Sequence, residues 1–469
     1  MKFKGKNIYA VFIVIILCLG SAVSAQVIFN WEFAGWYGGG CYPNVVFDPH
    51  IQGRLYLVSD VAGIWRSDNW GDQWYSVNKG LTHLNVTDVA VAPSDSNVVY
   101  VATAKGIFVS QDAGANWQAA DSLNGQMVFS RPEGYRAIAV HPNSPNVVCA
   151  GTKKGMIVCS TTYGAAWENV DPLSEKFLAN QPITVLAFNA DGSELYAASL
   201  TRMGKYSLPT HSWMMFPLAP QNITDFVISN RNPSLIYAAG SRMLWMSPDG
   251  GTTWQSSTPI SQGTIYRLAL DESGMTGKLR TAWNKGWNSG ILTTVNSGKT
   301  WSVTAKIMQP DLLADPTRAW YGPAGKTTAF KIDPFNPETM LRTDWWGVWR
   351  SNDGGISWQE KIVGAANVVG SDIAVNSRNE VYVATMDNGL LKSPDGGMTY
   401  QAVFPGPATD PDRNGHVWRV RLLDDLNIIA TSSPWDRDLN QVILSHDGGK
   451  TFSLVRGGLP EKRPRVNTL

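Results

Sequence analysis

One octet of residues recurs along most of this chain and constrains its fold more than any other feature. The octet has the form Ser-x-Asp-x-Gly-x-Thr-Trp. Eight copies occur: SDNWGDQW from Ser67, SQDAGANW from Ser110, STTYGAAW from Ser160, SPDGGTTW from Ser247, TVNSGKTW from Thr294, SNDGGISW from Ser351, SPDGGMTY from Ser393 and SHDGGKTF from Ser445. A decayed copy, YSLPTHSW from Tyr206, fills the gap in the series. The repeat length of about 47 residues predicts nine similar structural units.

Each unit has the same internal order. Around the copy at Ser351 the chain reads TTAFKIDP, ETMLRTD and GVWRS before the octet, and another short strand follows it. Four short strands in a repeat of 40–50 residues are typical of a β-propeller blade. The sequence therefore predicts an all-β fold of four-stranded blades. The nine units form either one large ring, or a seven-bladed propeller plus part of a second.

The octet resembles the Asp-box, or bacterial neuraminidase repeat, that occurs in several propeller families. Its Asp or Asn can accept hydrogen bonds from N–H groups of the turn, and its Gly can adopt a positive φ. The aromatic residue can pack between neighbouring blades. We therefore expect the octet to form the turn between the third and fourth strands of each blade, without a catalytic role.

The N-terminus has the pattern of an export signal. MKFKGKN is basic, IYAVFIVIILCLG is apolar, and SAVSA ends in small residues, which predicts a signal peptide over 1–25. Nothing later resembles a membrane span, so we expect a secreted protein, extracellular or periplasmic, that is not stably inserted in a membrane. We assign 26–330 to a first group of blades and 331–469 to further blades. The chain stops where another inner strand is expected, so we expect either a truncated chain or a C-terminal tail that does not close the ring.

Charge and cysteine content exclude several function classes. Lys and Arg number 39 against 38 Asp and Glu, with no basic block, which argues against nucleic-acid binding. No Cys/His cluster predicts a metal site, and no motif predicts a cofactor. Cys149 and Cys159 lie opposite each other in a predicted hairpin. They form either a disulfide or two small buried side chains.

Three aspartates occupy equivalent turns between the second and third strands of their blades. They are Asp60 in LVSDVAGIWRS, Asp344 in LRTDWWGVWRS and Asp387 in ATMDNGLLKS. These turns lie on the face opposite the Asp-box turns, because strands alternate in direction within a blade. Loops on a rigid scaffold are common sites of function. Each aspartate is either a catalytic carboxylate or a turn residue that accepts local N–H bonds.

Tryptophan is the second unusual feature of these turns. The chain has 20 Trp residues, and five of them are predicted in second-to-third turns: Trp283, Trp287, Trp345, Trp346 and Trp435. Exposed indoles beside carboxylates suit sugar rings, whose C–H faces stack on aromatic surfaces. The alternative is packing between blades. We treat these five residues as candidate substrate-binding residues.

Three stretches of the chain resemble the xyloglucan hydrolases of glycoside hydrolase family 74. They are WYGGGCYPNVVFDP followed by GRLYLVSDVAGIWRSD, then AFKIDPFNPETMLRTDWWGVWRSNDGG, and VYVATMDNGLLKSPDGG. The resemblance implies two seven-bladed propellers and inverting hydrolysis of a β-glucan such as xyloglucan. It also implies that Asp60 is the general base and Asp387 the general acid.

A non-catalytic function remains as the alternative. Other Asp-box propellers, such as sortilin-type receptors and photosystem assembly factors, bind proteins or peptides without chemistry. The second hypothesis is therefore a propeller that binds a protein, peptide or carbohydrate ligand. The sequence makes no prediction about the oligomeric state.

Overall fold

The computed structural model describes residues 36–120, 136–170, 181–217, 219–275, 277–286, 288–307, 326–386, 388–404, 416–433 and 441–455. The predicted signal peptide, 1–25, lies outside these residues. Within them the chain forms strands β1 to β36 and no helix, and therefore no helix that could cross a membrane. The described residues divide into two compact units, 37–369 and 370–455.

Seven four-stranded antiparallel sheets make up the unit 37–369, each with its strands in sequence order. The first contains β1 (Asn44–Phe47), β2 (Leu55–Val58), β3 (Ile64–Ser67) and β4 (Tyr75–Ser76). The second contains β5 (Val86–Ala92), β6 (Asp95–Thr103), β7 (Gly106–Ser110) and β8 (Gln118–Ala119). The third contains β9 (Ile138–Val140), β10 (Val148–Gly151), β11 (Ile157–Ser160) and β12 (Glu168–Asn169).

The remaining four sheets of this unit follow the same plan. The fourth contains β13 (Ile183–Phe188), β14 (Glu194–Ser199), β15 (Met203–Ser207) and β16 (Ser212–Met215). The fifth contains β17 (Asp225–Ile228), β18 (Ile236–Gly240), β19 (Met243–Ser247) and β20 (Gln255–Ser257). The sixth contains β21 (Thr264–Asp271), β22 (Lys278–Lys285), β23 (Asn288–Thr294) and β24 (Ser302–Ile307). The seventh contains β25 (Ala329–Ile332), β26 (Met340–Thr343), β27 (Val348–Ser351) and β28 (Gln359–Glu360).

The second unit contains two more sheets of the same kind. The eighth consists of β29 (Gly370–Val375), β30 (Val381–Thr385), β31 (Gly389–Ser393) and β32 (Gln401–Phe404). The ninth consists of β33 (Val417–Leu422), β34 (Ile428–Ser432), β35 (Gln441–Ser445) and β36 (Ser453–Val455). The inner strands β29 and β33 contact each other, and a shared hydrophobic core lies between the two sheets.

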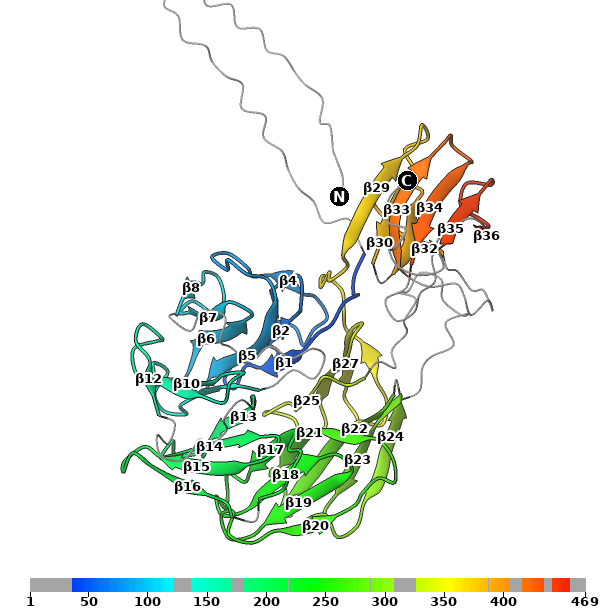
Figure 1. The fold of residues 1–469 in the computed structure, drawn as a ribbon. Helices are drawn as coiled ribbons and strands as arrows, with labels where there is room; N and C mark the ends of the chain where they lie inside the picture. Colours follow the sequence, from blue (N-terminus) through cyan, green and yellow to red (C-terminus); the bar gives the residue numbers. More distant parts are fainter. Residues whose placement is uncertain are drawn as a thin grey trace, which may run out of the picture. The chain divides into compact units, whose positions relative to one another are not determined.

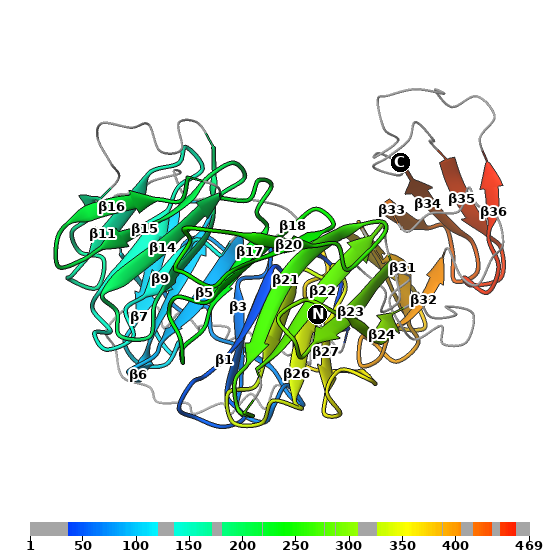
Figure 2. The ribbon, with the colours of Figure 1, turned by 90° about the horizontal axis from the view of Figure 1, so that it is seen from below.

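The seven sheets of residues 37–369 surround a common centre (Figure 1), and their strands run between the two faces of the ring (Figure 2). Each inner strand contacts the next, and β1 contacts β25. One buried hydrophobic cluster joins the first sheet to the seventh; it includes Tyr42, Leu57 and Trp65 together with Leu341 and Ile362. The predicted propeller of four-stranded blades is confirmed. Of the two predicted arrangements, the chain has a ring of seven blades and two further blades.

The ring extends to residue 369 and includes the seventh sheet. The seventh sheet belongs to the ring because its core is shared with the first sheet.

The Asp-box turns share one hydrogen-bond network. In the copy at Ser351, the Ser hydroxyl donates to Asp353 Oδ1 (2.7 Å) and accepts the N–H of Gly355 (2.8 Å). Asp353 Oδ1 also accepts the N–H of Ser357 (2.9 Å). Equivalent bonds occur in the other seven full copies. Asn69, Thr162 and Asn296 take the place of the Asp in three of these copies. Because all these acceptor contacts are local, the side chains at this position stabilise turns, as the sequence predicts.

The aromatic residue of the octet also links neighbouring blades. In the second sheet, Trp117 Nε1 donates to the carbonyl of Val77, which follows the outer strand of the first sheet (2.6 Å). In the first sheet, Trp74 Nε1 donates in the same way to Lys361 of the seventh sheet (2.7 Å). The Trp74 bond therefore contributes to closure of the ring.

A disulfide joins Cys149 of β10 to Cys159 of β11. The two residues are direct cross-strand partners in the third sheet. Of the two possibilities that the sequence left open for this pair, the structure has the disulfide. The third cysteine of the described residues, Cys41, is buried.

We expect Asp353→Ala to destabilise the ring by about 1 kcal/mol, the usual cost of losing a side-chain acceptor for main-chain N–H groups. Asp353→Asn should cost less than Asp353→Ala, because Asn296 makes the same contacts in the sixth sheet. Urea denaturation at pH 7 measures both variants.

The same pair of variants tests the charge of Asp353. Hydrogen bonds from Ser357 and Ser351 lower the pKa of Asp353 to about 2. An acid whose pKa is lowered by folding stabilises the fold above its unfolded pKa, and this contribution is lost as pH falls to about 2. The stability gap between wild type and Asp353→Asn should therefore narrow from pH 5 to pH 2. A gap that stays constant would contradict this role of the charge.

Candidate functional site

Two second-to-third turns, in the first and seventh sheets, are joined by the segment that precedes β1. The N–H of Asp60 donates to the carbonyl of Cys41 (3.1 Å). On the other side of the segment, the N–H of Tyr42 donates to the carbonyl of Asp344 (3.1 Å), and the N–H of Gly39 to that of Trp346 (3.3 Å). The structure therefore brings Asp60, Asp344 and Trp346 to one region of the ring.

Asp60 follows β2 and is only 5% exposed. Its Oδ1 accepts hydrogen bonds from the N–H of Cys41 (3.2 Å) and from Asn367 Nδ2 (3.3 Å). The first donor precedes β1 and the second follows β28, 307 positions from Asp60 along the chain. Closure of the ring therefore fixes the orientation of this carboxylate. Two N–H donors suit an ionised carboxylate, which is the form that a general base requires.

Asn367 is a site residue that the sequence analysis missed. It is 1% exposed, its Nδ2 also donates to the carbonyl of Cys41 (3.2 Å), and its N–H donates to the carbonyl of Gly38 (3.0 Å). It lies in a loop outside the octets and outside the second-to-third turns. No repeat or motif in the sequence marks it, because its role depends on contact between the two ends of the ring.

Three consecutive glycines, at positions 38 to 40, are required because the backbone of this segment passes very close to neighbouring residues. The three residues have φ of +81°, +80° and +67°, a region that side chains disfavour. A Cβ at Gly40 would lie 2.4 Å from Asn367 Nδ2, and one at Gly38 would lie 2.9 Å from the carbonyl oxygen of Trp346. The glycines therefore allow the segment to pass between the Asp60 turn and the Trp346 turn.

Tyr42 is completely buried at this junction. Its hydroxyl donates to the carbonyl of Ala365 (3.2 Å), and its own carbonyl accepts from Thr328 Oγ1 (2.5 Å). Burial, together with the charges of Asp60 and Asp344, raises the pKa of Tyr42 well above its ordinary value. The hydroxyl therefore remains a neutral hydrogen-bond donor at this junction.

Asp344 has a different environment from Asp60. It is fully buried, and its Oδ1 accepts the N–H groups of Trp346 (2.8 Å) and Gly347 (2.9 Å). Its Oδ2 accepts Trp349 Nε1 (2.9 Å) and pairs with Arg342 Nη1 (3.2 Å). Burial raises the pKa of Asp344, and the charge of Arg342 opposes that shift. Four donors on a fully buried carboxylate favour the turn-residue interpretation of Asp344.

The candidate tryptophans of this region fall into two groups. Trp345 and Trp346 are half-buried, with ring centroids 6.2 Å apart, and neither belongs to the hydrophobic cluster between the first and seventh sheets. Trp283 lies within β22 rather than in a turn, because β22 and β23 remain paired as far as Lys285 and Asn288. Trp283 packs against the core cluster between the fifth and sixth sheets.

Three other residues predicted for the site lie outside the described residues: Asp387, Trp287 and Trp435. Across the described part of the chain, no group of three or more His, Cys, Asp or Glu side chains is arranged to hold a metal ion.

No family model matches the chain. It is 23% identical to a xyloglucanase from Acetivibrio thermocellus over 401 residues, which cover 76% of this chain and 43% of that protein. It is also 23% identical to a xyloglucanase from Hypocrea jecorina over 385 residues, which cover 74% of this chain and 41% of that protein.

Solved structures show the same likeness. The GH74 xyloglucanase from Xanthomonas campestris superposes with a TM-score of 0.75 at 18% identity, covering 90% of this chain and 68% of that chain. An ancestral GH74 enzyme superposes with a TM-score of 0.72 at 17% identity, covering 91% of this chain and 64% of that one. The chain resembles the GH74 xyloglucanases.

The GH74 resemblance that three stretches of sequence predict is thus confirmed. The chain spans less than half the length of these two xyloglucanases. Two of the three stretches, WYGGGCYPNVVFDP with its following strands and the segment around Asp344, meet at the junction of the first and seventh sheets. The third contains Asp387 and begins with β30 of the second unit.

We expect Asp344→Ala to lower the free energy of unfolding by about 3–5 kcal/mol, because it removes the buried ion pair with the Arg342 guanidinium. Replacing both residues, as Arg342→Met with Asp344→Leu, should recover part of this loss, since no buried charge is then left unpaired. Chemical denaturation measures the three proteins. A single variant as stable as wild type would contradict the structural role of Asp344.

Proposed function

We propose that this chain contributes to hydrolysis of a xyloglucan-type β-glucan with inversion at the anomeric carbon. Asp60 is the general base and Asp387 the general acid. The single observation that carries the proposal is the setting of Asp60, a nearly buried carboxylate whose Oδ1 is held by two N–H donors in a chain that resembles GH74 xyloglucanases.

The chemistry needs two carboxyl groups with different protonation. The Asp60 carboxylate removes a proton from a water molecule, and the resulting hydroxide attacks the anomeric carbon from the face opposite the leaving oxygen. The protonated Asp387 carboxyl gives its proton to the glycosidic oxygen as the bond breaks. Inverting enzymes place the two groups roughly 6.5–9.5 Å apart so that water fits between them. Asp344 has no part in this proposal because its four contacts are structural.

The half-buried indoles of Trp345 and Trp346 supply the binding part of the proposal. They belong to the same turn as Asp344 and are joined to the Asp60 turn by the Gly39–Tyr42 segment. Aromatic faces near a carboxylate can stack against the C–H faces of sugar rings. We also propose that residues 1–25 direct export, which places the protein where a polysaccharide substrate occurs.

Activity is tested by reducing-sugar release from a β-glucan panel that includes xyloglucan, with the full-length gene product. Proton NMR of the first product anomer then reports inversion or retention. Cleavage of xyloglucan with an inverted product supports the proposal. Binding of a glycan without any cleavage would favour the non-catalytic alternative.

We expect Asp60→Asn to lower kcat on xyloglucan by about 10²–10⁴-fold, because the amide cannot accept the proton from water. The fold should persist, since the amide oxygen can still accept the N–H bonds from Cys41 and Asn367. Steady-state kinetics with a thermal melt separates the two effects. Asp353→Asn, in an Asp-box turn, is the matched control and should retain wild-type kcat. Wild-type turnover by Asp60→Asn would refute its role as base.

We expect Trp345→Ala or Trp346→Ala to weaken xyloglucan binding by about 1–3 kcal/mol, by analogy with stacking of bases on aromatic side chains. Affinity electrophoresis in gels that contain xyloglucan measures the retardation. Trp245→Ala, which removes a half-buried indole from β19 of the fifth sheet, is the control and should migrate as wild type does. Unchanged retardation with a strongly lowered melting temperature would show that these indoles serve packing.

A further inference from the structure

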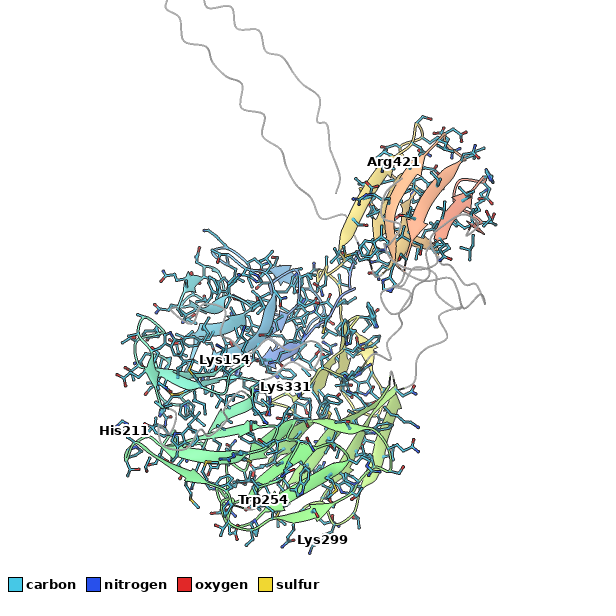
Figure 3. All side chains as sticks on the ribbon, in the orientation of Figure 1. Lys154, His211, Trp254, Lys299, Lys331 and Arg421 are labelled. Carbon is cyan, nitrogen blue, oxygen red and sulfur yellow. A yellow bond between two sulfur atoms is a disulfide. The ribbon has the colours of Figure 1, made fainter. Side chains whose placement is uncertain are left out.

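A cavity of about 330 Å³ lies among the inner strands at the centre of the seven-bladed ring. Its lining includes Val46 of β1, Asp88 of β5, Ile138 of β9, Leu186 of β13 and Lys331 of β25. Figure 3 shows Lys331 in this central position.

The cavity reaches the Asp-box face of the ring. Pro49, Pro93 and Pro334, which follow the inner strands β1, β5 and β25, complete the lining at that end. These prolines belong to turns between first and second strands, which lie on the same face as the Asp-box turns. The cavity is therefore distinct from the Asp60 region, which lies at second-to-third turns on the opposite face.

Positive charge exceeds negative charge around this cavity. Among the residues that line it, Arg136 and Lys331 are cationic and Asp88 is anionic. Arg136 pairs through Nη2 with Asp225 Oδ1 and donates to the carbonyl of Phe226 (3.0 Å), so it is anchored to the fifth sheet. Its Nε is buried without a hydrogen-bond partner among the described residues.

Asp88 is occupied by structural contacts. Its Oδ1 accepts Asn44 Nδ2 (2.7 Å) and the N–H of Val89 (2.9 Å), and its Oδ2 accepts the N–H of Ile138 (3.2 Å). These bonds link the inner strands of the first three sheets. The Asp88 oxygens therefore have few acceptor positions left for Lys331. The Nζ of Lys331 has no hydrogen bond and no ion pair within the described part of the chain.

The Lys331 side chain is half-buried in a largely apolar cavity, and a bound anion would offset its positive charge. Burial, followed by repulsion from Arg136, lowers the pKa of Lys331 to about 7, with Asp88 opposing and Arg267 adding to the shift. An anion that entered would favour the protonated ammonium. The excess of one positive charge matches a monovalent anion, and the apolar walls match a ligand with a short hydrocarbon part.

We propose that the central cavity binds a small monocarboxylate. Its carboxylate lies between Lys331 and Arg136, and its hydrocarbon part lies against Val46, Ile138 and Leu186. The volume is at the lower end of the range for small-molecule sites, which limits the ligand to a short chain. This site is independent of the proposed hydrolase activity.

Binding should depend on pH through Lys331. Between pH 6 and pH 8 the lysine of the empty cavity passes from mostly protonated to mostly neutral, because its pKa is about 7. The charged groups that act on Lys331 are Asp88 in β5, Arg136 two residues before β9, and Arg267 in β21. The affinity for a carboxylate should therefore fall about tenfold over this range.

The test is isothermal titration calorimetry of the full chain with propionate and butyrate at constant ionic strength. Propionamide, which has the same shape without charge, and sodium chloride are the ligand controls. We expect saturable binding of the carboxylates at pH 6, about tenfold weaker binding at pH 8, and at least tenfold weaker binding of propionamide. No saturable carboxylate binding at pH 6, or equal binding of propionamide, would overturn the proposal without any variant.

Lys331→Met tests the residue itself. Met is close to Lys in length, and the variant should fold because the half-buried ammonium makes no hydrogen bond or ion pair within the described residues. We expect at least tenfold weaker propionate binding and no pH dependence between pH 6 and pH 8. Lys299→Met, at an exposed Asp-box lysine on the outer edge of the ring (Figure 3), should bind as wild type does. A folded Lys331→Met protein with unchanged affinity would also overturn the proposal.

Discussion

The contact between the first and seventh sheets is the interaction on which the rest of the ring depends. Trp74 Nε1 donates to Lys361, and one buried hydrophobic cluster spans both sheets. No disulfide crosses this junction among the described residues, so hydrophobic burial and hydrogen bonds stabilise it. Asp60 takes one of its donors from each side of the junction. Any change that loosens the ring there should therefore disturb the orientation of that carboxylate before it unfolds the remaining blades.

Burial and donor count separate the aspartates of this chain into roles that residue type alone does not distinguish. Asp353 is exposed and held by hydroxyl and N–H groups of its own turn, which keeps it ionised. Asp344 is fully buried against Arg342 and three N–H donors. Asp60 is nearly buried, and its Oδ1 is held by donors from two distant parts of the chain. Among the described aspartates of second-to-third turns, this setting makes Asp60 the better candidate for chemistry.

The fold could be predicted from the sequence because it repeats. Eight octets and one decayed copy predict nine four-stranded sheets. The same repeat pattern predicts that Asp353 stabilises a turn. The site could be predicted only in part. The equivalence of turns identified Asp60, but it placed Asp344 in the same class, since the pairing with Arg342 depends on packing. Asn367 was missed because its contacts with Cys41 and Asp60 are long-range and leave no local pattern. Trp283 was expected in a turn, and the longer hairpin of the sixth sheet places it in a strand.

The fourth blade keeps the indole contact of the octet without its turn network. Its copy, YSLPTHSW, has no Gly, and the turn between β15 and β16 lacks the Ser–Asp–Gly network of the other copies. Trp213 Nε1 nevertheless donates to Val170 at the end of the third blade (2.5 Å). The indole contact persists where the turn network has been lost. The exposed tip of this turn, residues 209–211, should therefore accept an inserted peptide, such as an epitope or a linker to another domain, without loss of the indole contact.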